Sequence, residues 1–327
     1  MTPRFRVGLL GAGWIAAEHV AALAKYDDVE LVAVCDLDHT SAARLAPTGA
    51  SLYERWEELL ELERLDAVWV CLPPLAHRAP TVAALQRGVH VYLEKPIART
   101  PDDAAAIVDA AERSEAVCAV GYQWHATEVL DDLRDALAGQ DIALLVGRSI
   151  GPTGSRPWFL DRSQGGGNVL ERGSHQIDLM RTIAGEVVRV QAAASRVLLG
   201  QAEGDRGDIE DAATLVLHLE SGALATIVVG WTRRGQPGLY DVDVVATEAT
   251  LHLTLDPEFS LGGVSRGQPV EARGTEHPFE RTIARFLEAA RAGDSSRVFC
   301  TPADAARTLA VAVACERALD SGETVAV

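Results

Sequence analysis

The first 120 residues alternate between short apolar runs and segments with helical spacing, and this alternation constrains the fold most strongly. The apolar runs predict strands that are buried on both faces, and they lie at residues 6–10, 30–35, 67–72, 89–93 and 116–120. Buried strands separated by helices form a parallel, doubly wound sheet. We therefore expect an α/β domain in this part of the chain.

The pattern changes after Gly121. Apolar and polar residues alternate with period two at residues 213–219 and 251–255, which is typical of an antiparallel sheet. Further helices are predicted at residues 128–137, 169–184, 279–290 and 302–322. Because 327 residues exceed what one core usually supports, we expect two domains. Residues 1–121 carry the parallel sheet, and residues 122–327 form an α+β domain with a large, mainly antiparallel sheet.

The charge balance excludes two classes of partner. The chain has 30 Lys and Arg residues against 47 Asp and Glu residues, so its formal net charge is −17. Negative charge repels nucleic-acid phosphates and anionic lipids. Aromatic residues make up only 5% of the chain, which leaves few platforms for base stacking. We therefore expect a small-molecule partner, with no nucleic acid and no membrane.

The cysteines indicate the compartment. The five cysteines lie far apart and lack the two-residue spacing of zinc or redox motifs, so we expect reduced thiols in a cytoplasmic protein. No apolar stretch approaches the ~20 residues of a membrane-spanning helix. Arg4 and Arg6 before an apolar run imitate an export signal, but a strand, a glycine turn and a helix explain that run better.

A glycine turn follows the first predicted strand. Gly11 and Gly13 allow a tight turn and the close approach of a pyrophosphate to the N-terminus of the next helix, which begins with Trp14 and Ile15. Asp36 ends the second strand 25 residues after Gly11, where an acid accepts ribose hydroxyls. A carboxylate there repels a 2′-phosphate, so the sequence favours NAD over NADP. The alternative is that Asp36 only caps its own turn.

The third strand ends at Leu72, Pro73 and Pro74. Two prolines direct the backbone out of the sheet at the edge where a ligand of a doubly wound fold binds. His77 follows this edge, and we consider it either a cofactor contact or an ordinary residue at the start of a helix.

Two further blocks resemble the Gfo/Idh/MocA family of sugar and cyclitol dehydrogenases. The first is Glu94-Lys95-Pro96 at the end of a strand, and the second is a glycine run at 165–167 that leads to Glu171 and His175. The resemblance runs through nearly the whole chain. It implies a Rossmann domain, an NAD cofactor and a substrate domain that also forms the oligomer.

The resemblance implies catalytic roles for Lys95 and His175, and the chemistry of these side chains agrees. We add Glu171 to this catalytic set because of its position. Histidine titrates near neutral pH and can take the hydroxyl proton. Lys95 can stabilise negative charge on the substrate oxygen, and the family precedent implies a cis bond between Lys95 and Pro96. Glu171, one helical turn before His175, can orient the imidazole. The alternatives are a surface lysine and an ordinary solvated Glu–His pair.

The predicted binding residues form two sets. We expect cofactor contacts from Gly11, Gly13, Trp14, Ile15, Asp36, Leu72, Pro73, His77, Glu94, Lys95 and Gln123. We expect substrate contacts from Lys95, Trp124, Trp158, Asn168, Glu171 and His175. Trp158 can stack on a sugar face, or it can anchor its loop as a buried aromatic. No predicted ligand set has the spacing of a metal site, so no metal is expected.

Two positions depart from the family pattern. Glu171 stands where the family more often has aspartate, which puts its role in question. Trp124 and His125 stand where many members carry arginine, the side chain that grips anions in a bidentate manner. We therefore expect an uncharged substrate.

The sequence thus predicts an NAD-dependent oxidoreductase acting on a secondary alcohol or ketone of a neutral sugar, polyol or cyclitol. One alternative is an NAD-retaining glycosidase of the same family. Another is a nucleotide-sensing regulator, which is expected to lack Lys95 or His175. Val228 is apolar like its neighbours Ile227 and Val229, so both faces of the second sheet carry apolar residues. We therefore expect a homodimer or homotetramer.

Overall fold

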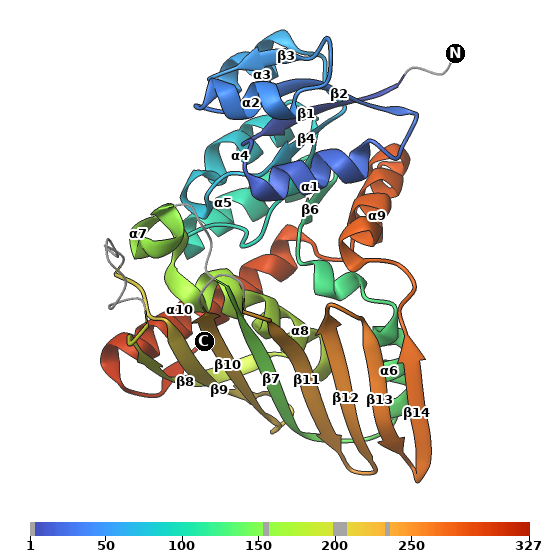
Figure 1. Ribbon diagram of the computed structural model, residues 1–327, viewed down its shortest axis with the longest axis vertical. Helices are drawn as coiled ribbons and strands as arrows, with labels where there is room; N and C mark the ends of the chain where they lie inside the picture. Colours follow the sequence, from blue (N-terminus) through green and yellow to red (C-terminus); the bar gives the residue numbers. More distant parts are fainter. Residues whose placement is uncertain (1–3, 153–156, 199–207, 233–235) are drawn as a thin grey trace. The chain divides into compact units, whose positions relative to one another are not determined.

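The computed structural model describes residues 4–152, 157–198, 208–232 and 236–327. Within these ranges the chain forms two compact units (Figure 1). The first contains the residues up to Gly121 together with 280–306, and the second contains residues 122–279 and 307–327. The sequence interpretation had placed residues 280–306 in the second domain. No helix of the described residues is long and apolar enough to cross a membrane.

The first unit contains a six-stranded parallel sheet in the order β3-β2-β1-β4-β5-β6. Its strands are β1 (Phe5–Leu10), β2 (Val29–Cys35), β3 (Ser51–Tyr53), β4 (Ala67–Val70), β5 (His90–Leu93) and β6 (Cys118–Val120). Its helices are α1 (Trp14–Leu23), α2 (His39–Leu45), α3 (Trp56–Leu62), α4 (Arg78–Gln86), α5 (Pro101–Glu112) and most of α9 (Pro278–Ala292). The predicted doubly wound parallel sheet is confirmed. Strand β3 was not predicted, because three residues are too few to show a pattern.

Aromatic rings explain why residues 280–306 belong to the first unit. Trp69 of β4 and Tyr92 of β5 stack with 5.5 Å between their ring centroids. Phe286 of α9 meets both rings edge-on, at 5.1 and 5.5 Å. All three side chains are fully buried. Because aromatic side chains bury large apolar areas, this cluster fixes α9 on the sheet. Its partners lie more than 190 residues away in sequence, so the local pattern does not reveal the contact.

The second unit contains a nine-stranded sheet in the order β14-β13-β12-β11-β7-β10-β9-β8-β15 (Figure 1). Its strands are β7 (Ile142–Pro152), β8 (Val187–Ser195), β9 (Ala212–Leu219), β10 (Leu224–Thr232), β11 (Leu239–Ala246), β12 (Ala249–Asp256), β13 (Ser260–Ser265), β14 (Gln268–Arg273) and β15 (Val325–Ala326). Only the β7–β10 pair is parallel, which confirms the mainly antiparallel sheet. Strands β13 and β14 were not predicted.

Helices cover one face of this sheet. They are α6 (Val129–Leu137), which packs on β12, β13 and β14, and α8 (Ser174–Ala184), which packs on β7 and β10. Gly147 of β7 permits the close approach of α8, since an added Cβ would lie 2.5 Å from both Gln176 and Met180. The last long helix is α10 (Pro302–Ser321). On the opposite face, Val146, Val216 and Val228 are half-buried.

The predicted helix over residues 169–184 is not regular. Its first part is the π-helical turn η4 (Val169–Gly173), and α8 follows from Ser174. A π-helical turn pairs residue i with i+5 and is frequent at functional sites. Glu171 lies in this turn and His175 lies in α8, so the regular four-residue spacing assumed from the sequence does not describe them.

Candidate active site

The predicted site residues fall into two groups, one in each unit, and we describe each group by itself. In the first unit the glycine turn joins β1 to α1. Gly11 has φ +90°, and an added Cβ would lie 2.4 Å from the carbonyl oxygen of Cys71 at the end of β4. Gly13 precedes the first helical residue, Trp14, and offers no capping side chain. The first N–H groups of α1 thus have no side-chain cap, and a helix N-terminus of this kind can receive a pyrophosphate.

Asp36 lies directly after β2 and faces this turn. One of its oxygens accepts the N–H of Ala12 at 2.6 Å, and the other accepts the N–H of Asp38 at 2.8 Å. Asp36 therefore caps its own turn, but these two bonds do not use all of its acceptor positions. A carboxylate has about four acceptor positions, so two remain for ribose hydroxyls. Trp14 is 75% exposed at the start of α1, with Ile15 beside it in the same turn. These residues fit an NAD cofactor.

His77 contacts backbone carbonyl groups of the residues that follow β4 and Lys95. Its Nε2 lies 2.7 Å from the carbonyl oxygen of Leu72, and its Nδ1 lies 3.0 Å from that of Pro96. The side chain is fully buried, and this burial lowers the pKa of His77. Leu72 and Pro73 are only half-buried at this edge. The position of His77 thus ties Leu72 to the turn that follows Lys95.

Lys95 follows β5, and the Lys95–Pro96 peptide bond is cis, as expected. The Lys95 N–H donates to Oε2 of Glu94 at 3.1 Å. The other oxygen of Glu94 lies 2.7 Å from Nε2 of His19, a buried residue of α1. Sequence reasoning did not single out His19. In the sequence, His19 is marked only as a polar residue in a helix that is mostly apolar.

In the second unit, a glycine loop precedes η4. Gly166 and Gly167 have φ +80° and +79°, a backbone region that favours glycine. Asn168 is fully buried, and its Nδ2 donates to the carbonyl oxygen of Asp211 at 3.3 Å. The N–H of Val169 donates to Glu210, which also binds Arg162 at 2.5 Å. The loop is therefore fixed to the residues that precede β9. Sequence reasoning had not identified Glu210.

His175 lies near two aromatic rings of the residues after β6. The Trp124 ring centroid is 5.0 Å from that of His175 and tilted by 42°, and the Tyr122 ring meets it edge-on at 5.9 Å. Trp124 and Gln123 belong to the short helix η2 (Gln123–Ala126). The structure thus brings together two predicted substrate residues, His175 and Trp124.

Trp158 lies in the short helix η3 (Pro157–Leu160) and stacks on Phe159 with 3.9 Å between centroids. An added Cβ at Gly165 would lie 2.8 Å from the Trp158 carbonyl oxygen, so the glycine run permits this packing. Trp158 is half-buried. These contacts favour the anchoring interpretation, while substrate stacking stays a prediction. Arg156, which neighbours this loop, lies outside the described residues.

Arg172 is a neighbour of the predicted residues that the sequence did not reveal as a candidate. Its Nη1 donates to the Tyr240 hydroxyl at 2.6 Å, and its Nη2 donates to the Pro152 carbonyl oxygen at 3.0 Å. The guanidinium lies 4.4 Å from the Trp231 ring centroid. The arginine next to Glu171 is thus engaged in several contacts within the protein.

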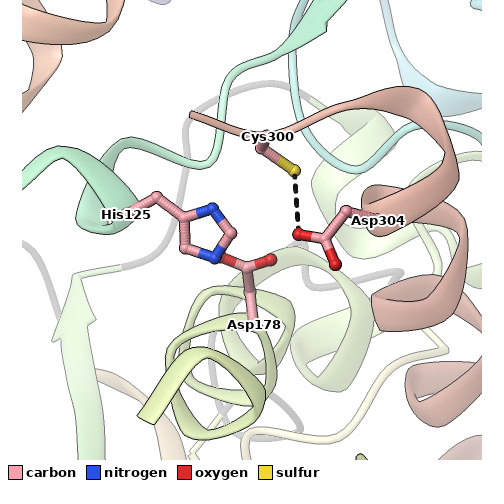
Figure 2. Close-up of side chains that lie close together, drawn as sticks. All are labelled: His125, Asp178, Cys300 and Asp304. Carbon is pink, nitrogen blue, oxygen red and sulfur yellow. Dashed lines mark hydrogen bonds and ion pairs between the residues drawn. The ribbon is translucent and has the colours of Figure 1, made fainter. Parts of the chain in front are cut away.

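His125 stands at the second position that departs from the family pattern. Its Nε2 lies 3.1 Å from Oδ2 of Asp178 on α8 (Figure 2). The same nitrogen also contacts the Thr182 hydroxyl. The other oxygen of Asp178 accepts the Thr308 hydroxyl at 3.0 Å. Figure 2 also draws a pair from the first unit, Cys300 and Asp304, whose sulfur and carboxylate lie 3.7 Å apart.

Comparisons with known proteins agree with this arrangement. The chain matches the oxidoreductase family with an NAD-binding Rossmann fold over residues 5–122. Residues 142–252 match the C-terminal domain of the same family. The chain is therefore an oxidoreductase with NAD as its cofactor. It belongs to the Gfo/Idh/MocA family.

Two curated relatives and one solved structure illustrate the family. The rhizopine catabolism protein MocA of Rhizobium meliloti is 31% identical over 72% of this chain and 73% of its own length. The D-apiose dehydrogenase of Paraburkholderia graminis is 32% identical over 77% and 68%. The WlbA dehydrogenase of Bordetella pertussis, solved with NADH and UDP-GlcNAcA, has a TM-score of 0.82 at 22% identity and covers 99% of both chains.

Proposed function

We propose that this protein is an NAD-dependent dehydrogenase that oxidises a secondary alcohol of a neutral sugar, polyol or cyclitol, or reduces the corresponding ketone. The observation that carries the proposal is that both Lys95 and His175 are present within the family's sequence blocks, in a chain that belongs to this oxidoreductase family. The curated relatives named above include a dehydrogenase of a sugar, which supports this substrate class. The glycosidase and regulator alternatives gain no support from those relatives.

Most of the residues proposed to hold the cofactor belong to the first unit. The glycine turn would receive the pyrophosphate, and Asp36 would accept the ribose hydroxyls. Trp14, Ile15, Leu72, Pro73 and Glu94 complete the proposed set, together with Gln123 of η2. When bound, NAD supplies the hydride acceptor or donor of the reaction.

His175 and Lys95 would act on the substrate oxygen, His175 on its proton and Lys95 on its charge. In oxidation His175 accepts the hydroxyl proton, which prepares the oxygen to become a carbonyl. The Lys95 ammonium stabilises the negative charge that develops on that oxygen. In reduction of the ketone, His175 returns the proton to the substrate oxygen, and Lys95 again stabilises the negative charge on that oxygen. Glu171 is proposed to orient the His175 ring.

Three described arginines of the second unit already bind other groups of the protein, which supports an uncharged substrate. Arg172 is engaged with Tyr240 and Trp231, and Arg162 with Glu210. Arg148 makes two hydrogen bonds to Asp241, at 2.6 and 2.7 Å. Since bidentate binding of a carboxylate or phosphate needs a guanidinium with donors to spare, these contacts do not favour an anionic substrate.

Replacing Asp36 with Ala tests the cofactor assignment. We expect the Kd for NAD to rise about 10–100-fold, because hydrogen bonds to a charged group contribute about 1.5–3 kcal/mol. The Kd for NADP should rise less, so the preference between the cofactors narrows. Titration of both cofactors by calorimetry measures this ratio. Asp38→Ala is the matched control, because Asp38 caps α2 through Thr40 and makes no bond to the glycine turn. An unchanged ratio in Asp36→Ala would contradict the assignment.

We also propose self-association through the face of the second sheet that lies opposite helices α6 and α8. Val146, Val216 and Val228 lie on this face in neighbouring strands, and the charges of Arg148 and Asp241 compensate each other there. A partly apolar face whose arginine is already paired suits a second copy of the chain despite the net charge of −17.

Introducing a charge on this face tests self-association. Val228→Lys is expected to lower the mass measured by light scattering to that of the monomer, because an unpaired lysine would be buried at the contact. Leu62→Lys in the first unit is the control, since Leu62 is exposed on α3. Equal masses for Val228→Lys and the wild type would count against this face.

We propose a reducing, cytoplasmic compartment for this protein. The support is that all five cysteines are buried and none of them forms a disulfide. Burial raises the pKa of Cys35 and Cys118 to about 12, which keeps these thiols protonated and unreactive.

A further inference from the structure

A buried pair of polar side chains links the cofactor-binding helix to Lys95. His19 lies on α1, is 0% exposed, and places Nε2 at 2.7 Å from Oε1 of Glu94. Glu94 is 7% exposed at the end of β5. Burying an imidazole and a carboxylate is unfavourable unless each finds a hydrogen-bond partner. A leucine at position 19 would avoid this desolvation, so the histidine calls for an explanation other than packing.

The contacts of Glu94 supply that explanation. A carboxylate can only accept hydrogen bonds, so Nε2 of His19 donates to it. The second oxygen of Glu94 accepts the backbone N–H of Lys95 at 3.1 Å. One carboxylate thus joins a side chain of α1 to the main chain of Lys95. Since α1 begins at the glycine turn, the same helix contributes to cofactor binding and to this contact.

An aromatic ring and a glycine lie beside the His19–Glu94 pair. The Tyr92 ring lies 5.0 Å from the His19 ring and meets it edge-on. An added Cβ at Gly121 would lie 3.3 Å from Oε1 of Glu94, so a glycine leaves room for the carboxylate. Burial, and then the negative charge of Glu94, raise the pKa of the Cys71 thiol well above its ordinary value.

We propose that His19 is a positioning residue for the reaction: it fixes Glu94, and through Glu94 it holds the Lys95 backbone against helix α1. The inference rests on the proposed function, because it takes Lys95 as the group that contacts the reacting oxygen. A small displacement of a reacting group can lower a rate by about 100-fold. Loss of the His19 donor should therefore lower kcat while the glycine turn and Asp36 still bind NAD.

Two variants of His19 separate positioning from packing. His19→Leu removes the donor, whereas His19→Gln keeps an N–H donor on a flexible side chain. In His19→Leu we expect kcat to fall about 10–100-fold and the Kd for NAD to stay close to that of the wild type. In His19→Gln we expect most of the wild-type kcat to be restored. Leu23→Ala is the control for a general loss of stability, because Leu23 is buried on the same helix and plays no part in the pair.

Hydrogen exchange of the Lys95 amide, measured by NMR in the cofactor-free protein, tests the contact without any activity. We expect exchange to be about fivefold faster in His19→Leu, the factor that corresponds to one hydrogen bond, and near the wild-type rate in His19→Gln. Unchanged exchange in His19→Leu, or equal exchange and kcat in the two variants, would overturn the inference. If Lys95→Met keeps full turnover, the proposed function fails while the exchange result still decides whether His19 holds Lys95.

Discussion

Lys95→Met is expected to lower kcat by about 10²–10³-fold, the usual effect of losing one donor that stabilises developing charge. Methionine keeps the length of the side chain but removes the ammonium, so the negative charge on the substrate oxygen loses its partner. The Kd for NAD should change little, because the groups proposed to bind NAD, the glycine turn and Asp36, follow other strands. Steady-state kinetics at saturating cofactor, together with calorimetric titration of NAD, measures both quantities.

The chain offers an unusually clean control for this prediction. It contains only two lysines, Lys25 and Lys95. Lys25 is 59% exposed and forms a surface ion pair with Glu280, and such pairs contribute little to stability. Lys25→Met should therefore retain the wild-type kcat and stability. Comparable kcat values for Lys95→Met and Lys25→Met would refute the role of Lys95.

His175→Ala is expected to lower kcat by about 10²–10⁴-fold, the contribution of a well-placed general base. The imidazole lies near the Tyr122 and Trp124 rings, so its removal leaves a space bounded by aromatic side chains. We expect added imidazole to bind there and to restore part of the rate. Turnover measured as a function of imidazole concentration tests both the loss and the rescue.

His252→Ala is the matched control for His175. His252 belongs to the same unit, is exposed, and pairs with Asp243 at the surface of the sheet. Its replacement should leave kcat unchanged, and imidazole should have no effect on it. A His175→Ala protein that retains the wild-type kcat would exclude His175 as the base.

Local patterns predicted much of the fold because they are carried by neighbouring residues. The strand β4 is a continuous apolar run, and the buried residues of β9 (Ala213, Leu215, Leu217 and Leu219) alternate with more accessible ones, as expected. Strand β13 escaped prediction because Gly262 and Gly263 interrupt its alternation. The π-helical turn at η4 was missed because its residues are compatible with a regular helix.

Contacts between distant segments account for what the sequence could not predict at the site. The glycine turn, Asp36 and Lys95 stand out because each follows a recognisable strand. His19 and Glu94 are 75 residues apart, and Arg172 and Tyr240 are 68 apart, so neither pair forms a local motif. Polar pairs of this kind depend on the three-dimensional packing of the elements that carry them.

The production of NADH from a panel of neutral sugars, polyols and cyclitols tests the central claim most directly. The wild-type protein is incubated with NAD and each compound, and the absorbance of the reduced nicotinamide is followed. We predict net formation of NADH with at least one neutral compound, and none with the matching carboxylate or phosphate derivative. Release of an aglycone from a glycoside without net NADH, or turnover of anionic compounds alone, would contradict the account.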